Sequence, residues 1–174
     1  MHQKIIILDF GSQYTQLIAR RIRELNVYCE IHPWNKVPKI GEDIVGVILS
    51  GSPFSVLDEA SPRPDLSAIK GTLPLLGVCF GAQYLAQNHG GEVLPSSIRE
   101  YGRAILSKVY NQYPISNGLT VNSQVLMSHC DTIKKVPSNY TIFASTPEVD
   151  VAGYMVEGEE TYGVQFHPEV YHSS

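Results

Sequence analysis

The sequence contains little cysteine, and Cys29, Cys79 and Cys130 show no paired spacing. An odd, unpaired set does not support a disulfide framework and leaves room for a reactive thiol. Basic clusters are equally scarce. The longest covers residues 20–23, and 13 Lys and Arg against 17 Asp and Glu give a net charge of −4. This balance argues against nucleic acid and anionic membranes as partners.

Long apolar runs, low-complexity segments and internal repeats are also absent. No stretch approaches the ~20 apolar residues of a membrane span, and the N-terminus lacks the layout of a signal peptide. We therefore expect a cytoplasmic protein. The 174 residues, 43% of them hydrophobic, suit one α/β domain with a single sizeable core, and we find no linker that would divide residues 1–174.

The most specific pattern covers residues 73–91, with Cys79 near the centre. The segment begins with an apolar run of strand length, and from Phe80 the apolar spacing becomes helical. Cys79 therefore falls on a strand-to-helix turn. Gly77 and Gly81 flank it, the small-residue pattern of a sharp turn that exposes a nucleophile, with the first helical N–H groups facing the reacting atom. A cysteine that only fills the core would leave both glycines unexplained, so we expect a nucleophile elbow built on sulfur.

The first half of the chain alternates between strand-like and helix-like patterns. Apolar or β-branched runs predict four strands, at residues 4–8, 27–31, 45–49 and 73–78. A helical spacing covers residues 12–25, and Cys29, on the second strand, is expected in the core. This alternation favours a doubly wound, mostly parallel sheet of the flavodoxin-like type. Ligands of such sheets collect at the carboxyl ends of the strands, where three loops should share one rim: residues 9–12, 50–55 and 78–81.

The second half has shorter strand-like runs separated by turn signals. They lie at residues 104–109, 124–127, 141–145, 151–156 and 162–165. We expect these strands to extend the sheet and to add an antiparallel layer within the same domain.

Near the end of the chain, His167 is followed by Pro168 and Glu169. Proline favours an extended backbone at the residue before it, and residues two apart on an extended segment project to the same side. Glu169 could therefore orient the His167 ring, and Cys79 would supply the nucleophile of a Cys-His-Glu set.

Other histidines compete for the role of base. His129 lies in a polar cluster, whereas His89 and His172 have no carboxylate at a suitable spacing. A metal site of His167, Glu169 and His172 is a weak alternative because no pair of histidines has the i, i+4 spacing of a helical metal site. The SGSP sequence at residues 50–53 is either an ordinary turn or a donor of N–H groups to a developing oxyanion.

Four sequence blocks resemble the signatures of class I glutamine amidotransferase domains. They are GVCFGAQ from Gly77, SGSP from Ser50, MSHCD from Met127 and GVQFHPEV from Gly163. The segment at residues 7–31 is more specifically similar to the glutaminase domains of GMP synthetases. Together these similarities span nearly the whole chain.

The resemblance implies a role for each matching residue. Cys79 would be the nucleophile, His167 the general base and acid, and Glu169 the residue that orients His167. The backbone N–H groups of Ser52 and Phe80 would form the oxyanion hole. Glutamine would be held by Gly51, Gln83, Cys130 and Asp131.

Two positions depart from the family pattern. The family usually has Gly-Gly where this chain has Gly51 and Ser52, and glycine where it has Cys130. A serine keeps the N–H donor of a glycine in place only if its φ is negative. Cys130 would either narrow the glutamine pocket or add a second oxidisable thiol.

The implied reaction is hydrolysis of L-glutamine to glutamate and ammonia through a γ-glutamyl thioester. An ATP-dependent synthetase domain, on the same chain or a separate subunit, would use the ammonia to convert XMP to GMP. We expect no cofactor in this domain, because the phosphate-binding pattern G-x-x-x-x-G-K-[ST] is absent, and we assign ATP and Mg to the synthetase domain. Residues 1–174 would be the N-terminal part of a longer GMP synthetase or, as a second possibility, a stand-alone subunit.

Three other functions remain open at this point. The chain could be a Cys-His-Glu hydrolase of another γ-glutamyl substrate, a glutaminase that serves a different synthetase, or a docking subunit that has lost catalysis.

Overall fold

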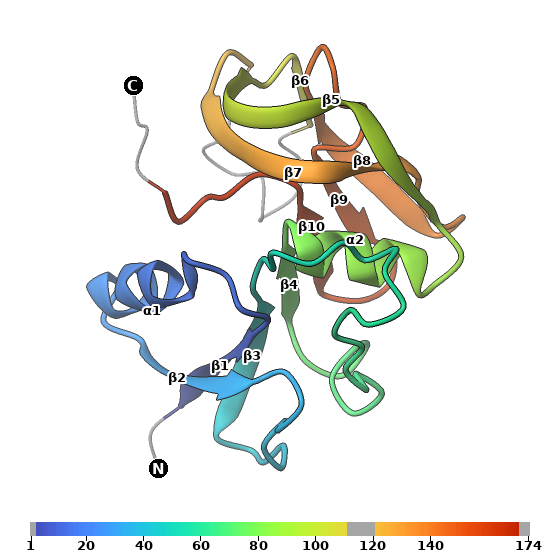
Figure 1. The fold of residues 1–174 in the computed structure, drawn as a ribbon. Coiled ribbons are helices and arrows are strands. Elements are labelled where there is room, and N and C mark those ends of the chain that lie inside the picture. The colour runs from blue at the N-terminus through green and yellow to red at the C-terminus, as the bar shows by residue number, and fades with distance from the viewer. Residues whose placement is uncertain (1–2, 111–120, 171–174) are drawn as a thin grey trace.

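The computed structural model describes residues 3–110 and 121–170, without the side chains of 97–101 and 129–130. Eight of the described strands form one sheet in the order β2-β1-β3-β4-β10-β9-β8-β6 (Figure 1). Their bounds are β1 Lys4–Asp9, β2 Tyr28–Pro33, β3 Ile44–Leu49, β4 Leu75–Val78, β6 Lys108–Val109, β8 Tyr140–Ser145, β9 Gly153–Val156 and β10 Thr161–Val164. The neighbours from β2 to β10 pair in parallel, whereas β9, β8 and β6 continue the sheet antiparallel. The predicted sheet and its antiparallel extension are confirmed.

The two described helices cover opposite faces of the parallel strands. Successive side chains of a strand point to opposite faces, so Ile7 of β1 packs with α1, Thr15–Glu24, while Ile6 and Leu8 pack in the cluster that contains α2, Phe80–Gln87. Cys29 is buried beneath α1, where its thiol contacts the carbonyl of Ala19, as the sequence predicts. A helix on each face is the defining feature of a doubly wound sheet.

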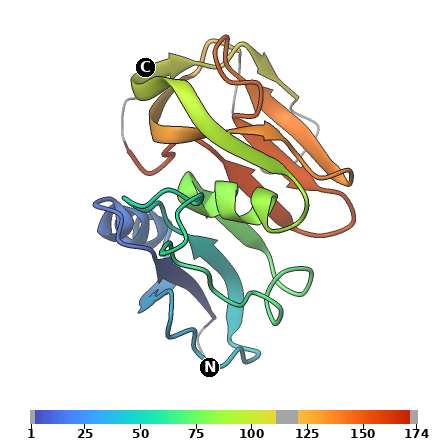
Figure 2. The same ribbon diagram turned by 45° about the vertical axis from the view of Figure 1, so that its right-hand side comes forward.

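The second half departs from the predicted strand lengths. The strand predicted at 104–109 is split between the end of β5, Glu92–Ile105, and β6, while β7, Gln124–Lys135, extends far beyond the predicted 124–127. β5 and β7 pair as a separate antiparallel ribbon that arches over α2 in both views (Figures 1 and 2). The ribbon is buried only locally, for example at Val93 and Met127, so much of its length lacks the alternating apolar pattern that marks a strand.

The carboxyl ends of β1, β3, β4 and β10 lie at one edge of the sheet. The segments that leave these strands therefore meet there, beneath the ribbon of β5 and β7 (Figure 2). Within the described residues, no helix has the length and apolar character needed to cross a membrane.

Candidate active site

Cys79 occupies the turn between β4 and α2 with a φ of 54° and a ψ of −104°. A positive φ on a residue other than glycine is strained and is retained only where the surroundings enforce it. Here the Cys79 N–H donates to the carbonyl of Val164 at 2.8 Å, and the Cys79 carbonyl accepts from the N–H of Gln83 at 3.0 Å. The predicted elbow is thus present, and hydrogen bonds on both sides hold its strained backbone.

Gly77 and Gly81 serve this turn through close packing. A Cβ on Gly77 would lie 2.6 Å from the carbonyl carbon of Gly81, and one on Gly81 would lie 2.7 Å from the Cβ of Leu49. The end of β4, the first turn of α2 and β3 therefore pack with their backbones in near contact. The glycines provide this space, while the positive φ falls on Cys79 itself.

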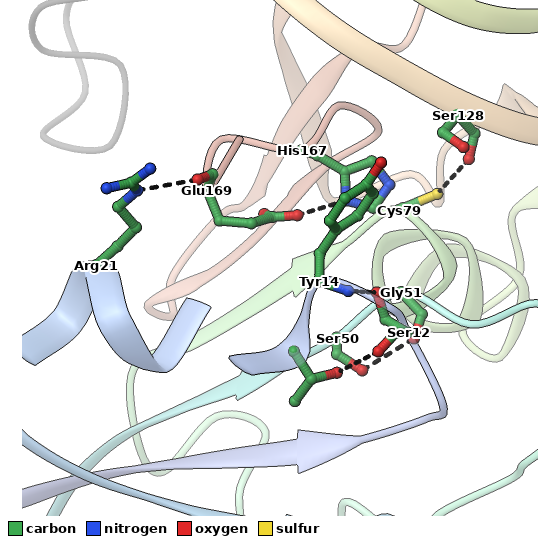
Figure 3. Close-up of polar contacts among 10 residues, drawn as sticks. Ser12, Tyr14, Arg21, Ser50, Gly51, Cys79, Ser128, His167 and Glu169 are labelled. Atoms are coloured by element: carbon green, nitrogen blue, oxygen red, sulfur yellow. Dashed lines mark hydrogen bonds and ion pairs between the residues drawn. The ribbon is translucent and has the colours of Figure 1, made fainter. Parts of the chain in front are cut away.

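The Cys79 side chain is less open than the sequence suggests, with 5% of the residue exposed. Its thiol lies 3.4 Å from the backbone carbonyl of Ser128 on β7, to which it donates (Figure 3). The ribbon therefore covers one side of the sulfur, and two cavities lie beside it. Ser128 belongs to the MSHCD block, but no sequence signal marks its carbonyl as a partner of the thiol.

His167 and Glu169 form a buried pair, with 2.5 Å between Nδ1 of the ring and Oε1 of the carboxylate. The ring donates its Nδ1 proton to the carboxylate, which leaves Nε2 for Cys79, beside the ring in Figure 3. Burial alone would lower the pKa of His167, but hydrogen bonds and charge interactions with Cys79 and Glu169 outweigh it and raise the pKa to about 9. The ring beside the Cys79 sulfur is therefore protonated at neutral pH.

The backbone route that brings this pair together differs from the predicted one. Residues 167–170 form a turn closed by a 3.3 Å hydrogen bond from the Val170 N–H to the His167 carbonyl, not an extended segment. Pro168 suits the second position of such a turn because its φ is preset. The reach of Glu169 to the ring was predicted correctly, but for the wrong geometric reason.

Contacts from distant elements fix the rest of this turn. The His167 N–H donates to the carbonyl of Leu126 at 2.9 Å, and Nε of Arg21 on α1 donates to the Glu169 carbonyl at 3.0 Å (Figure 3). Tyr14, at the N-terminus of α1, sets its ring edge-on to His167 with 5.1 Å between centroids. No sequence signal distinguishes Tyr14 among the ten tyrosines of the chain.

Two cavities flank the sulfur. The first, of about 410 Å³, is lined by Gly11, Ser12, Gln13, Tyr14, Ser52, Pro53, Cys79, Ser128 and His167. The second, of about 300 Å³, is lined by Ser52, Pro53, Phe54, Ser55, Asp58, Cys79, Phe80, Gln83, Ser128 and Asp131. Cys79 lines both, so a molecule in either cavity could contact the thiol.

The predicted donors of the oxyanion hole are the backbone N–H groups of Ser52 and Phe80. Phe80 is the first residue of α2, so its N–H has no acceptor within the helix. The positive φ values of described non-glycine residues fall on Asn26, Cys79 and Asn122, so Ser52 keeps the negative φ that its N–H donor requires. The Ser52 hydroxyl accepts from the N–H of Phe54 at 3.1 Å, which fixes this loop.

Gly51 is a position where a side chain would disturb the pair. A Cβ there would lie 3.2 Å from Cε1 of His167 and 3.7 Å from Cβ of Cys79. Gly51 therefore lets the loop after β3 approach both side chains closely.

Gln83 and Asp131, predicted to hold the substrate, lie side by side on the second cavity. The Gln83 Nε2 donates to the Asp131 backbone carbonyl at 3.2 Å and to Oε1 of Gln165 at 3.3 Å, while the Asp131 carboxylate accepts from the Ser55 hydroxyl. Gln165 lies within the GVQFHPEV block, but no role was predicted for it, because a glutamine at the end of a strand-like run carries no chemical signal of its own. The side chain of Cys130 lies outside the described residues.

The competing histidines do not join this site in the described part of the chain. His89 follows α2, and its Nδ1 lies 2.8 Å from the carbonyl of Leu85. The His129 side chain and all of His172 lie outside the described residues. Among the side chains that the structure describes, no group of three His, Cys, Asp or Glu could hold a metal ion.

Comparison with known proteins identifies the family of this chain. The class-I glutamine amidotransferase family model matches residues 6–174. Among curated proteins, the chain is 61% identical over 173 residues to a Cytophaga hutchinsonii protein and 57% identical over 174 residues to one from Christiangramia forsetii. Both are named GMP synthase (glutamine-hydrolyzing). The matches cover 99% and 100% of this chain but 34% of each relative, so the chain spans about a third of their length.

Solved structures agree on the fold. A candidate GMP synthase subunit from Thermoplasma acidophilum superposes with a TM-score of 0.83 and 28% identity, covering 99% of this chain and 87% of the other. A glutamine amidotransferase from Thermotoga maritima superposes with a TM-score of 0.79 and 22% identity, covering 98% and 77%, and this match supports the fold alone. The chain belongs to the class-I glutamine amidotransferase family.

Proposed function

We propose that this chain hydrolyses the side-chain amide of glutamine through Cys79, His167 and Glu169. The observation that carries the proposal is the convergence of a strained cysteine, which lines two cavities, with a protonated imidazole and a buried carboxylate. This set has the roles of nucleophile, acid-base group and orienting group.

In the first half of the reaction, His167 holds the proton of Cys79, and the Cys79 thiolate attacks the amide carbon of glutamine. The N–H groups of Ser52 and Phe80 stabilise the negative oxygen of the tetrahedral intermediate. His167 gives its Nε2 proton to the departing nitrogen, the C–N bond breaks, and ammonia leaves behind a γ-glutamyl thioester. Glu169 keeps the ring oriented and stabilises its protonated form.

In the second half, water attacks the thioester carbonyl. The neutral His167 ring accepts the proton of the water, the C–S bond breaks, and glutamate is released. The reaction consumes one water and forms one glutamate and one ammonia for each glutamine. No step requires a metal or an organic cofactor.

We further propose that the ammonia serves an ATP-dependent synthetase region that converts XMP to GMP. Support comes from the curated relatives, which are named GMP synthase (glutamine-hydrolyzing) and are about three times as long as this chain. ATP and Mg would act in that region. In the complete protein, Cys79→Ala should abolish GMP formation from glutamine while ammonium salts still support it.

The direct test is ammonia release from glutamine, compared with release of amino acids from γ-glutamyl peptides. We expect turnover of glutamine, and a loss of ~10³-fold or more in Cys79→Ala. Cys29→Ala, at a buried cysteine beneath α1, is the matched control and should retain turnover. Cleavage of γ-glutamyl peptides without cleavage of glutamine would replace this proposal with the hydrolase alternative.

A further inference from the structure

Gln165 is a buried amide that the proposed chemistry does not use. It lies directly after β10, two residues before His167, and 1% of it is exposed. Its Oε1 accepts the hydrogen bond from Gln83, whereas its buried Nε2 has no partner among the described residues. Buried polar atoms without partners are rare in folded proteins, so an amide kept in this position calls for an explanation.

The orientation of the neighbouring Gln83 amide follows from a backbone group. The Asp131 carbonyl, 3.2 Å from the Gln83 side chain, can only accept, so the Gln83 atom that faces it must be the donor Nε2. The same Nε2 faces Gln165 at 3.3 Å, so Gln165 must present its acceptor, Oε1. The chain of hydrogen bonds thus has a single consistent arrangement.

This arrangement determines what Gln83 offers to the cavity. Nε2 uses both of its protons on Asp131 and Gln165. The Oε1 of Gln83 makes no hydrogen bond within the described part of the chain, and Gln83 lines the second cavity beside Cys79. Oε1 is therefore the polar atom of the Gln83 side chain that remains for a ligand in this cavity.

We propose that Gln165 is a positioning residue that locks the Gln83 amide with its oxygen toward the cavity, where it accepts from an N–H group of the substrate. This inference rests on the proposed glutaminase function, because glutamine carries both an ammonium and an amide N–H. Without Gln165, the Gln83 side chain keeps one anchor and rotates more freely, which weakens substrate binding while Cys79 and His167 stay in place.

The test is a double-mutant cycle of Gln83→Met and Gln165→Met, measured as steady-state glutamine hydrolysis by the chain. Methionine matches glutamine in length but offers no strong acceptor. We expect Gln165→Met to raise KM by about tenfold, the effect of one lost hydrogen bond, with kcat within about twofold of the parent. In the Gln83→Met background, the same change should leave KM unchanged, because Gln165 acts through Gln83.

Two further variants complete the design. Thr161→Val controls for the loss of a buried polar group and should leave KM unchanged, because the Thr161 hydroxyl on β10 is buried and has no partner among the described residues. If Gln165→Met does not fold, Gln165→Asn replaces it, because its shorter amide cannot reach Gln83. An unchanged KM in a folded variant, or an equal KM effect with and without Gln83, would overturn the inference. Failure of the proposed function would appear separately, as a parent chain that does not hydrolyse glutamine.

Discussion

At the scale of single residues, Cys79 combines a positive φ with almost complete burial. The backbone conformation directs the thiol between the two cavities and leaves the Phe80 N–H free of helical acceptors. The strain stored at this residue is of order 1–3 kcal/mol. We infer that the strained conformation is retained because an unstrained turn would point the sulfur away from the two cavities.

Two replacements of Cys79 should measure its backbone strain independently of its role in catalysis. Cys79→Gly and Cys79→Ala should both be inactive, but glycine adopts a positive φ without strain. We therefore expect Cys79→Gly to exceed Cys79→Ala in free energy of unfolding by ~1 kcal/mol, measured by urea denaturation. A glycine variant less stable than the alanine variant would show that the turn is not strained.

The raised pKa of His167 predicts a dependence of stability on pH. Its value of about 9 in the folded chain lies above the unfolded value near 6.5. The protonated ring therefore contributes stability that is complete below about pH 6.5 and is lost as pH rises through about 9, by roughly 1–3 kcal/mol.

His167→Asn should remove that dependence. The comparison is the urea unfolding free energy of the parent and of the variant at several values between pH 6 and pH 10. The difference between the two proteins should shrink as pH rises. A constant difference across this range would contradict the assigned cause.

Sequence alone predicted Cys79, His167 and Glu169 as site residues because each has a local signal, either flanking glycines or an adjacent proline. Tyr14 and Gln165 have no such signal. They enter the site through contacts with residues more than eighty positions away, and such contacts depend on strand order.

At the scale of elements, the elbow depends on the close approach of β4, α2 and β3. A side chain at Gly77 would meet the backbone of the first turn of α2, which cannot yield without moving the helix. This approach places the N-terminus of α2 next to the sulfur. The local pattern predicted the strand and the helix correctly, but their contact with β3 at Leu49 is set by tertiary packing.

The substitution Gly77→Ala should therefore destabilise the folded chain strongly. We expect it to lower the free energy of unfolding by ~3 kcal/mol or more, and to reduce glutaminase activity in any folded fraction. Gly46→Ala is the matched control, because a Cβ there meets its nearest atom at an ordinary 3.6 Å, and it should cost less than ~1 kcal/mol. Equal effects of the two substitutions in thermal and urea unfolding would show that the approach of β4 and α2 is not tight.

The ribbon of β5 and β7 was the element least predictable from sequence. Its strands pair with each other and only partly with the core, so periodicity underestimates their length. The ribbon nonetheless supplies the Ser128 carbonyl and Asp131, which line the cavities beside Cys79.

At the scale of the whole molecule, both halves of the chain build the site. The first half provides Cys79 and the loops after β1 and β3, and the second half provides His167, Glu169 and the ribbon. Arg21 on α1 also reaches the Glu169 carbonyl across the sheet edge. The sequence predicted a shared rim from strand ends, but it could not show that β10 lies next to β4, which is the pairing that brings His167 to Cys79.

The most direct test of the central claim is the covalent labelling of the chain by a diazo-ketone analogue of glutamine, followed by intact mass measurement and peptide mapping. We expect one adduct per chain, located on Cys79 and blocked by excess glutamine, with none in Cys79→Ala. A folded chain whose Cys79 stays unmodified, alone and with the synthetase region added, would contradict the account. An adduct confined to Cys29 or Cys130 would contradict it equally.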